Sequence, residues 1–233
     1  MSENLGFAMR VKYVKQGRLA YLSHLETIRS MERIIRRAAL PYAVTEGFNP
    51  HMKVSFGPAL PCGAAGLGEY LDLRLREQID CDEALERMKA ASVADLAPVA
   101  CEYISVHADA VTVAFPLSVW EAHIVGASME QLQEAFAALG QRGYIEVERK
   151  SKKRRGQMEI KRIELEGRLV AGPVFDQLQD AVAVRFETMA QNQGSSLRPD
   201  RYIESAFALM NPAATQPAVS YLARTELRGA PSA

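Results

Sequence analysis

The pattern of apolar and polar residues in the first half of the chain predicts a strand, a helix and then further strands. Residues 7–22 alternate loosely around Gly17, which is typical of a strand or hairpin with one buried face. Ser23-His-Leu-Glu26 has the form of a capping box, in which the serine hydroxyl and the glutamate satisfy free amides at a helix start. We therefore expect a helix that begins at residue 23 or 24 and ends at Pro41.

After this helix the pattern predicts short strands and a second helix. Residues 42–45 and 53–59 are strand candidates, and the segment between them contains Gly and Asn-Pro steps that force an irregular backbone. Residues 68–75, GEYLDLRL, alternate strictly and predict a strand. The segment from Cys81 is expected to form a helix with acidic residues in its first turn, followed by a strand at 99–106.

The second half of the chain roughly repeats this order of elements. A second capping box, Ser128-Met-Glu-Gln131, predicts the start of a helix that runs to Leu139. The remaining pattern predicts a helix at 199–210 and strands at 111–125, 143–148, 158–170, 181–189 and 219–227.

The order strand–helix–strand–strand–helix–strand is that of a split βαβ, or ferredoxin-like, domain. We therefore predict an α+β protein with two tandem ferredoxin-like domains and antiparallel sheets. The predicted N-terminal domain covers residues 1–108, and the predicted C-terminal domain covers residues 109–233. A length of 233 residues fits two small domains of roughly 100 residues each.

Composition excludes several classes of protein. The formal net charge is zero, which excludes a uniformly basic nucleic-acid binder but allows separate charged patches. Cys62, Cys81 and Cys101 form no CxxC pair, so we expect reduced thiols, no metal site and no cofactor. The first residues have no signal-peptide pattern, and no run approaches the ~18 apolar residues that span a bilayer. A cytoplasmic location without a membrane partner is expected.

The first predicted helix carries a row of arginines on the side opposite its apolar face. Guanidinium groups match phosphate oxygens, and several on one helix face could follow a nucleic-acid backbone. The same arginines could instead form a solvated face with pairs between residues four apart, such as Glu32 with Arg36. The candidate phosphate-binding residues on this helix are Arg29, Arg33, Arg36 and Arg37.

The loop after this helix, GFNPHMK, offers groups for stacking and for phosphate binding. Phe48 could stack on a base or anchor the core, and Asn49 lies in the Asn-Pro step. His51 and Lys53 could contact phosphate. If the loop folds back over the helix start, His24 and His51 could form a pair for acid–base RNA cleavage or metal binding, although no third ligand is evident.

A basic segment in the second half, residues 149–155, carries six cations in seven residues. At a hairpin tip it would make a salt-sensitive phosphate contact, or it could serve only as a solubilising turn. Its candidate binding residues are Lys150, Lys152, Lys153, Arg154 and Arg155.

Several of these motifs occur together in one known family. SHL followed by arginine pairs, then GFNPH-x-K-x-S-F, then GEYLDLRL closely resemble the radical S-adenosylmethionine (SAM)-linked protein family, a bacterial domain of unknown function. Ser196-Leu-Arg-Pro-Asp200 and Ala223-Arg-Thr225 resemble its weaker C-terminal signatures. The resemblance implies a partnership with a radical SAM enzyme, to which such domains are fused or paired. This chain has no C-x₃-C-x-x-C triplet for an iron–sulfur cluster, so we expect it to act through that partner.

These observations predict a non-catalytic RNA-binding accessory protein that presents RNA to a radical SAM enzyme. One alternative is a protein–protein adaptor for that enzyme without RNA binding. Another is a phosphate-handling enzyme that uses His24 and His51.

Overall fold

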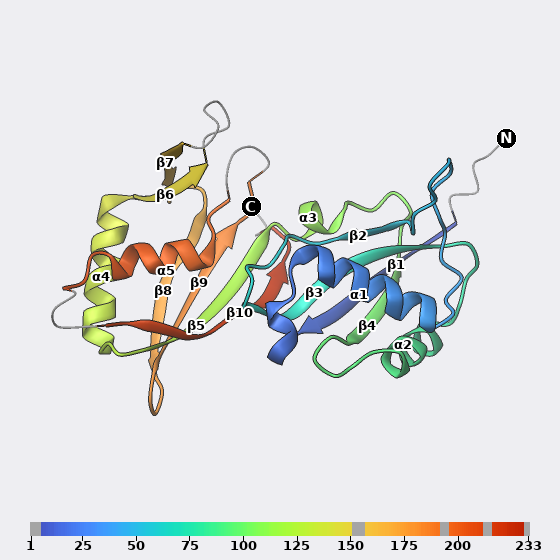
Figure 1. Cartoon of the computed structure of the whole chain (residues 1–233), viewed down its shortest axis with the longest axis horizontal. Helices are drawn as coiled ribbons and strands as arrows, with labels where there is room; N and C mark the ends of the chain where they lie inside the picture. The colour runs from blue at the N-terminus through green and yellow to red at the C-terminus, as the bar shows by residue number, and fades with distance from the viewer. Residues whose placement is uncertain (1–5, 151–156, 192–195, 212–215, 231–233) are drawn as a thin grey trace. The chain divides into compact units, whose positions relative to one another are not determined.

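The computed structural model describes residues 6–150, 157–191, 196–211 and 216–230 (Figure 1). It is a mixed α+β structure whose strands pair mostly in antiparallel fashion. The chain divides into two compact units, Met1–Phe115 with Arg224–Ala233, and Pro116–Ala223. The end of the chain, from Arg224, therefore belongs to the first unit. The predicted domain boundary between residues 108 and 109 places it in the second domain. The sequence-based boundary stays a prediction.

The first unit consists of a sheet with two helices on one of its faces. Within it β1 pairs with β3 and β4, and β2 pairs with β3, all in antiparallel fashion. Its elements are β1 (Phe7–Lys15), the short 3₁₀ helix η1 (Gly17–Tyr21), α1 (His24–Arg37), β2 (Val54–Phe56), β3 (Ala65–Leu75), α2 (Cys81–Ala90), β4 (Pro98–Ile104) and the short helix α3 (Val111–Ala114). The last strand of the chain, β10 (Ala218–Arg228), contributes its residues from Arg224 onward.

Helix α1 begins where the sequence predicts. The Ser23 hydroxyl accepts a hydrogen bond from the Glu26 amide, and the Glu26 carboxylate accepts one from the Ser23 amide at 2.8 Å. This capping box satisfies two amides that the first helical turn leaves free. The buried side of α1 packs on the sheet, and the core of the first unit includes Met9, Val11, Met31, Ile35, Leu71, Leu73 and Leu75.

The second unit repeats the alternation of strands and helices with one additional hairpin. Strands pair in antiparallel fashion in the order β5-β9-β8, and β6 and β7 form a separate two-stranded sheet. The elements are β5 (Leu117–Val125), α4 (Met129–Arg142), β6 (Tyr144–Lys150), β7 (Met158–Glu164), β8 (Leu169–Gln177), β9 (Val182–Met189), α5 (Pro199–Phe207) and the first part of β10. None of the helices in the described ranges is long and apolar enough to cross a membrane.

Three of the predicted elements differ from the structure in extent. In residues 7–22 the strand alternative is confirmed by β1, whereas the hairpin alternative is wrong, because the backbone at Gly17 adopts a φ of 53° and continues into η1. Residues 111–114 form a turn of helix, and β5 begins only after Pro116, whose ring removes a backbone donor. The predicted strand at 158–170 is two strands, since Gly167 takes a φ of 67° in the turn that separates β7 from β8.

Candidate nucleic-acid interface

The four arginines of α1 lie on the exposed side of the helix. At about 100° per residue they fall within an arc of roughly 100°, and the side chains of Arg29, Arg33, Arg36 and Arg37 are all exposed. The Arg36 guanidinium pairs with Glu32 at 3.2 Å, which is the ion pair expected of a solvated face. Arg33 donates to the Ser30 hydroxyl at 3.0 Å, and Arg37 forms no ion pair with any described residue. The face therefore has several guanidinium groups available to a partner.

The loop between α1 and β2 is held at its base by backbone hydrogen bonds. Val44 pairs with Met52, and the Lys53 amide donates to the Ala43 carbonyl at 2.8 Å. Nearer the tip, the Thr45 amide donates to the His51 carbonyl and the His51 amide donates to the Thr45 hydroxyl at 2.9 Å. We call residues 44–52 the tip loop. Its two arms are fixed, so the residues at its end project from a defined base.

Phe48 lies at the end of the tip loop and is fully exposed, at 112% of its reference accessibility. It is therefore not a core anchor. Gly47 precedes it with a φ of 118°, a conformation that side chains with a Cβ rarely adopt. Asn49 and His51 beside it are also exposed. The ring of Phe48 is therefore accessible for stacking.

Lys53 faces a different side of the first unit from the arginines of α1. Cross-strand partners lie on the same face of a sheet, and Val54 is paired with Leu73, which packs under the helices. Its neighbours Lys53 and Ser55 therefore point to the opposite face, which we call the far face. The predicted binding residues of the first unit are thus divided among α1, the tip loop and the far face.

The structure does not bring His24 and His51 together. His24 lies beside Glu69 of β3, whereas Tyr42, two residues before the tip loop, pairs with the other end of β3, at Leu75. Six residues of strand separate these points, which is about 20 Å at ~3.3 Å per residue. The hollow lined by His24 has a volume of about 10 Å³, roughly enough for one water molecule. The separation and the small hollow do not support a substrate that contacts both histidines.

A buried polar cluster around His24 is the part of the site that sequence reasoning missed. Arg224 of β10 pairs with Glu69 of β3, and both side chains are almost fully buried, at 2% and 3% exposure. Lys15 is also buried and donates to the Leu22 carbonyl at 2.8 Å. Burial lowers the pKa of the Lys15 ammonium, and the nearby Arg224 acts in the same direction. These groups are satisfied by one another and by backbone carbonyls, which indicates a structural role.

The pKa of His24 is lowered, first by burial and then by the positive charges of Lys15 and Arg224, with Glu69 opposing. At pH values between this lowered pKa and about 6.5, the pKa of an unperturbed histidine, the unfolded chain binds more protons than the folded chain. The contribution of His24 to stability is therefore complete above pH 6.5 and is lost as the pH falls. We expect His24→Gln to flatten the loss of stability between pH 7 and pH 5, measured by urea denaturation.

The exposed His51 provides the matched control for this experiment. His51→Gln is expected to leave the pH profile unchanged. If His24→Gln and the wild type lose stability in parallel on acidification, the assignment of this pH dependence to His24 is wrong.

The predicted basic hairpin is described only at its base. Lys150, at the end of β6, is exposed, and Arg149 pairs across the hairpin with Glu159 at 2.6 Å. The four other candidates, Lys152, Lys153, Arg154 and Arg155, lie outside the described residues.

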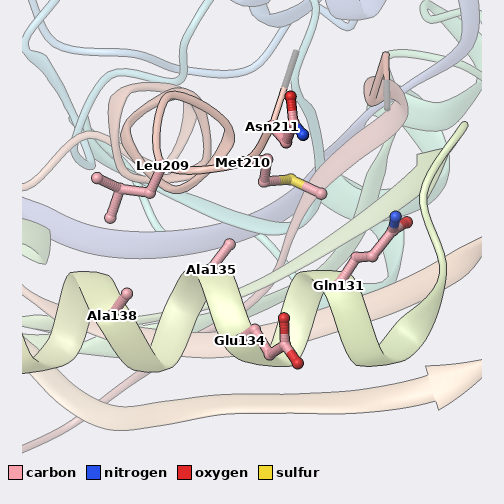
Figure 2. Close-up of a pocket in the computed structure, with 7 residues that line it drawn as sticks. All are labelled: Gln131, Glu134, Ala135, Ala138, Leu209, Met210 and Asn211. Atoms are coloured by element: carbon pink, nitrogen blue, oxygen red, sulfur yellow. The ribbon is translucent and has the colours of Figure 1, made fainter. Parts of the chain in front are cut away.

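A separate hollow lies between α4 and the end of α5 in the second unit (Figure 2). Its volume is about 320 Å³. Figure 2 shows Gln131 and Glu134 on α4 and Met210 on the opposite side. The charged group in its lining is a carboxylate, Glu134, so this hollow is not suited to phosphate.

Comparison with protein families gives one match that covers most of the chain. The family described as "Uncharacterized protein conserved in bacteria (DUF2344)" matches residues 8–199. The chain belongs to this family. The matched region includes α1, the tip loop and Glu69, whereas Arg224 lies beyond it. The family description names no partner enzyme, so a link to radical SAM proteins stays a prediction.

Other comparisons give only distant likenesses. No curated protein matches. A solved structure described as "Crystal Structure of a Cbf5-Nop10-Gar1 Complex" contains a chain that is 11% identical, with a TM-score of 0.47. The match covers 96% of this chain but only 50% of that one, so the present chain spans about half of its length. A putative glycine cleavage system transcriptional repressor is 9% identical, with a TM-score of 0.21 and coverage of 92% and 96%. Neither likeness assigns a fold or a function.

Proposed function

We propose that this protein is a non-catalytic accessory protein that binds single-stranded RNA through the tip loop and the arginines of α1. The observation that carries the proposal is the fully exposed Phe48, held at the end of an anchored loop that follows an arginine-faced helix. Aromatic side chains stack on unpaired bases, and cationic groups nearby follow the phosphates. A stacking group and a cationic face belong to the same 30-residue stretch of the first unit.

We also infer that each unit is built as a split βαβ unit. In the first, α1 and α2 follow β1 and β3, and the strand order β4-β1-β3-β2 supports this arrangement. In the second, the order β10-β5-β9-β8 has the same form, with the β6–β7 hairpin as an insertion after α4. Sheets of this kind bind RNA in several protein families, but this is an analogy of fold, and the proposed function rests on the site residues.

Recognition is favoured over catalysis by the contents of the site. The tip loop carries His51 without an orienting carboxylate among its described hydrogen-bond partners, and the small hollow at His24 has no room for a substrate. General acid–base catalysis requires two such groups within reach of one substrate. The proposed role is therefore to hold RNA for a partner, and the sequence resemblance suggests a radical SAM enzyme.

A protein–protein adaptor is the second candidate function. Tyr21 at the end of η1 and Leu25 in the first turn of α1 are 71% and 63% exposed. Large apolar side chains of this kind frequently anchor protein interfaces. They lie at the opposite end of α1 from the tip loop, so a protein partner and RNA could use different ends of the helix. An adaptor is expected to co-purify with its enzyme after nuclease treatment.

Replacement of Phe48 by alanine tests the proposed function. One lost stacking contact corresponds to about 1–3 kcal/mol, so we expect affinity for single-stranded RNA to fall by about 5- to 150-fold. Phe48→Trp should retain binding because it keeps an aromatic face. Affinity would be measured by fluorescence anisotropy with a labelled single strand of mixed sequence, and the corresponding duplex should bind more weakly.

Leu25→Ala is the matched control, because it removes another exposed apolar side chain from the same unit. It should leave RNA affinity unchanged, and neither alanine variant should alter the urea midpoint. The absence of any RNA binding by the wild type at low salt would overturn the proposal. Equal loss with Leu25→Ala would indicate nonspecific apolar contact.

A further inference from the structure

The far face of the first unit carries a groove that none of the preceding observations assigns to a function. Its volume is about 340 Å³, within the range of sites that hold small ligands or parts of larger ones. It lies in the unit's sheet where Ala8 of β1, a small residue, is flanked by Arg74 of β3 and Ile104 of β4. The residue that precedes β2, Lys53, completes the row, and its carbonyl accepts from the Arg74 amide at 2.9 Å.

The charges along this groove are not balanced. The next row of the sheet contains the only carboxylate in the groove lining, Asp72, and this group is already engaged by the Arg10 guanidinium at 2.7 and 2.9 Å. Neither Lys53 nor Arg74 forms an ion pair with a described residue. The row of Lys53 and Arg74 therefore carries positive charge without a counter-charge from the described chain.

Arg74 has a further unsatisfied group. Its Nη2 atom donates to the Val106 carbonyl at 2.6 Å, whereas its Nη1 atom is buried and has no hydrogen-bond partner among the described residues. Buried donors without acceptors are rare in folded proteins and require an explanation. An anion in the groove would supply both the counter-charge and a set of acceptor oxygens.

Hydroxyl groups complete the lining. Ser55 projects from β2 on the far face, and Ser105 follows β4, so both line the groove with Lys53 and Arg74. A guanidinium, an ammonium and hydroxyls are the usual donors to phosphate oxygens. We propose that this groove binds a backbone phosphate of the RNA strand whose base stacks on Phe48.

The proposal rests on the proposed function and names a second contact of the same RNA. Lys53 directly follows the tip loop and lies five positions after Phe48, which is at most about 18 Å of chain. A single strand that stacks on Phe48 can therefore continue along the arm of the loop to the groove. The strand would then pass toward the far face, away from the exposed face of α1.

The experiment measures the affinity of labelled single-stranded RNA over a range of potassium chloride concentrations. Each lost phosphate contact lowers the slope of log K against log salt by about 0.7 for single strands. Because Lys53 and Arg74 would contact the same phosphate, the double variant Lys53→Met/Arg74→Met should lower the slope by about 0.7 and weaken binding by about tenfold or more at low salt. Arg76→Met, an exposed residue just after β3, is the control and should change the slope by less than half of that amount.

Two further measurements test the groove independently of Arg74. Lys53→Met and Ser55→Glu alter exposed side chains and should fold normally, so they test the groove even if Arg74 variants are unstable; each should weaken RNA binding. Inorganic phosphate, compared with chloride at equal ionic strength, tests whether a free anion is the ligand. Selective competition by phosphate with no effect of the variants on RNA would overturn the assignment to RNA.

The outcomes separate the two proposals. If Phe48→Ala weakens RNA binding but the groove variants do not, the groove proposal is wrong and the proposed function stands. If the wild type binds no RNA, both are wrong. Loss of affinity and slope in the groove variants, with the Arg76 control unchanged, supports both.

Discussion

Glu69→Gln is expected to lower the free energy of unfolding by about 3–5 kcal/mol, the usual cost of leaving one member of a buried ion pair without its partner. The Arg224 guanidinium donates from Nε to Glu69 Oε1 at 2.8 Å and from Nη2 to the other carboxylate oxygen. Its Nη2 atom also donates to the Pro58 carbonyl at 2.6 Å. With a neutral amide at position 69, the buried positive charge keeps only weaker partners.

Urea denaturation, followed by far-UV circular dichroism, provides the measurement. Glu83→Gln is the control, since Glu83 pairs with Arg87 on the exposed side of α2 and such pairs contribute about 1 kcal/mol or less. The double variant Glu69→Leu/Arg224→Met removes both charges of the pair and should recover much of the lost stability. A decrease below about 1 kcal/mol for Glu69→Gln would show that the pair is not required for the fold.

Charge reversal of the α1 face is expected to reduce RNA affinity by about 100-fold or more. The variant combines Arg29→Glu, Arg33→Glu and Arg36→Glu, which replaces three possible phosphate contacts with repulsion. The slope of log K against log salt should also fall by about 2 for a single strand. Because these side chains are exposed, the cost to stability should be small, arising mainly from the lost Arg36–Glu32 pair.

A matched reversal elsewhere on the first unit controls for net charge. Arg76→Glu, Arg87→Glu and Lys89→Glu change the charge by the same amount at exposed positions outside α1. This control should weaken RNA binding far less, because it acts only through the long-range field. Equal loss in the two triple variants would mean that α1 has no specific role.

Local signals in the sequence were sufficient for several elements of the fold. The capping boxes at Ser23 and Ser128 correctly predicted the starts of α1 and α4, because the pairing groups lie three residues apart. The strict alternation of residues 68–75 predicted β3, although the strand begins earlier, at Ala65. Where the chain turns at a glycine inside an alternating segment, as at Gly167, alternation alone does not show the break.

The candidate site was only partly accessible from sequence. The exposed arginines follow from helical periodicity, but the exposure of Phe48 does not, because the same residue could have anchored a core. The groove depends on the register between Lys53 and Arg74, and register is set by tertiary pairing. The Glu69–Arg224 pair joins residues 155 positions apart. Both residues lie in recognisable motifs, but nothing in the spacing of these motifs indicates contact.

The position of Arg224 has a consequence for synthesis on the ribosome. Glu69 emerges 155 residues before its guanidinium partner, which at 5–20 residues per second corresponds to about 8–30 s. During that interval the nascent first unit holds a carboxylate without its counter-charge and lacks the last part of its sheet. The first unit is therefore completed only after the second unit has been synthesised, because its buried ion pair must wait for Arg224.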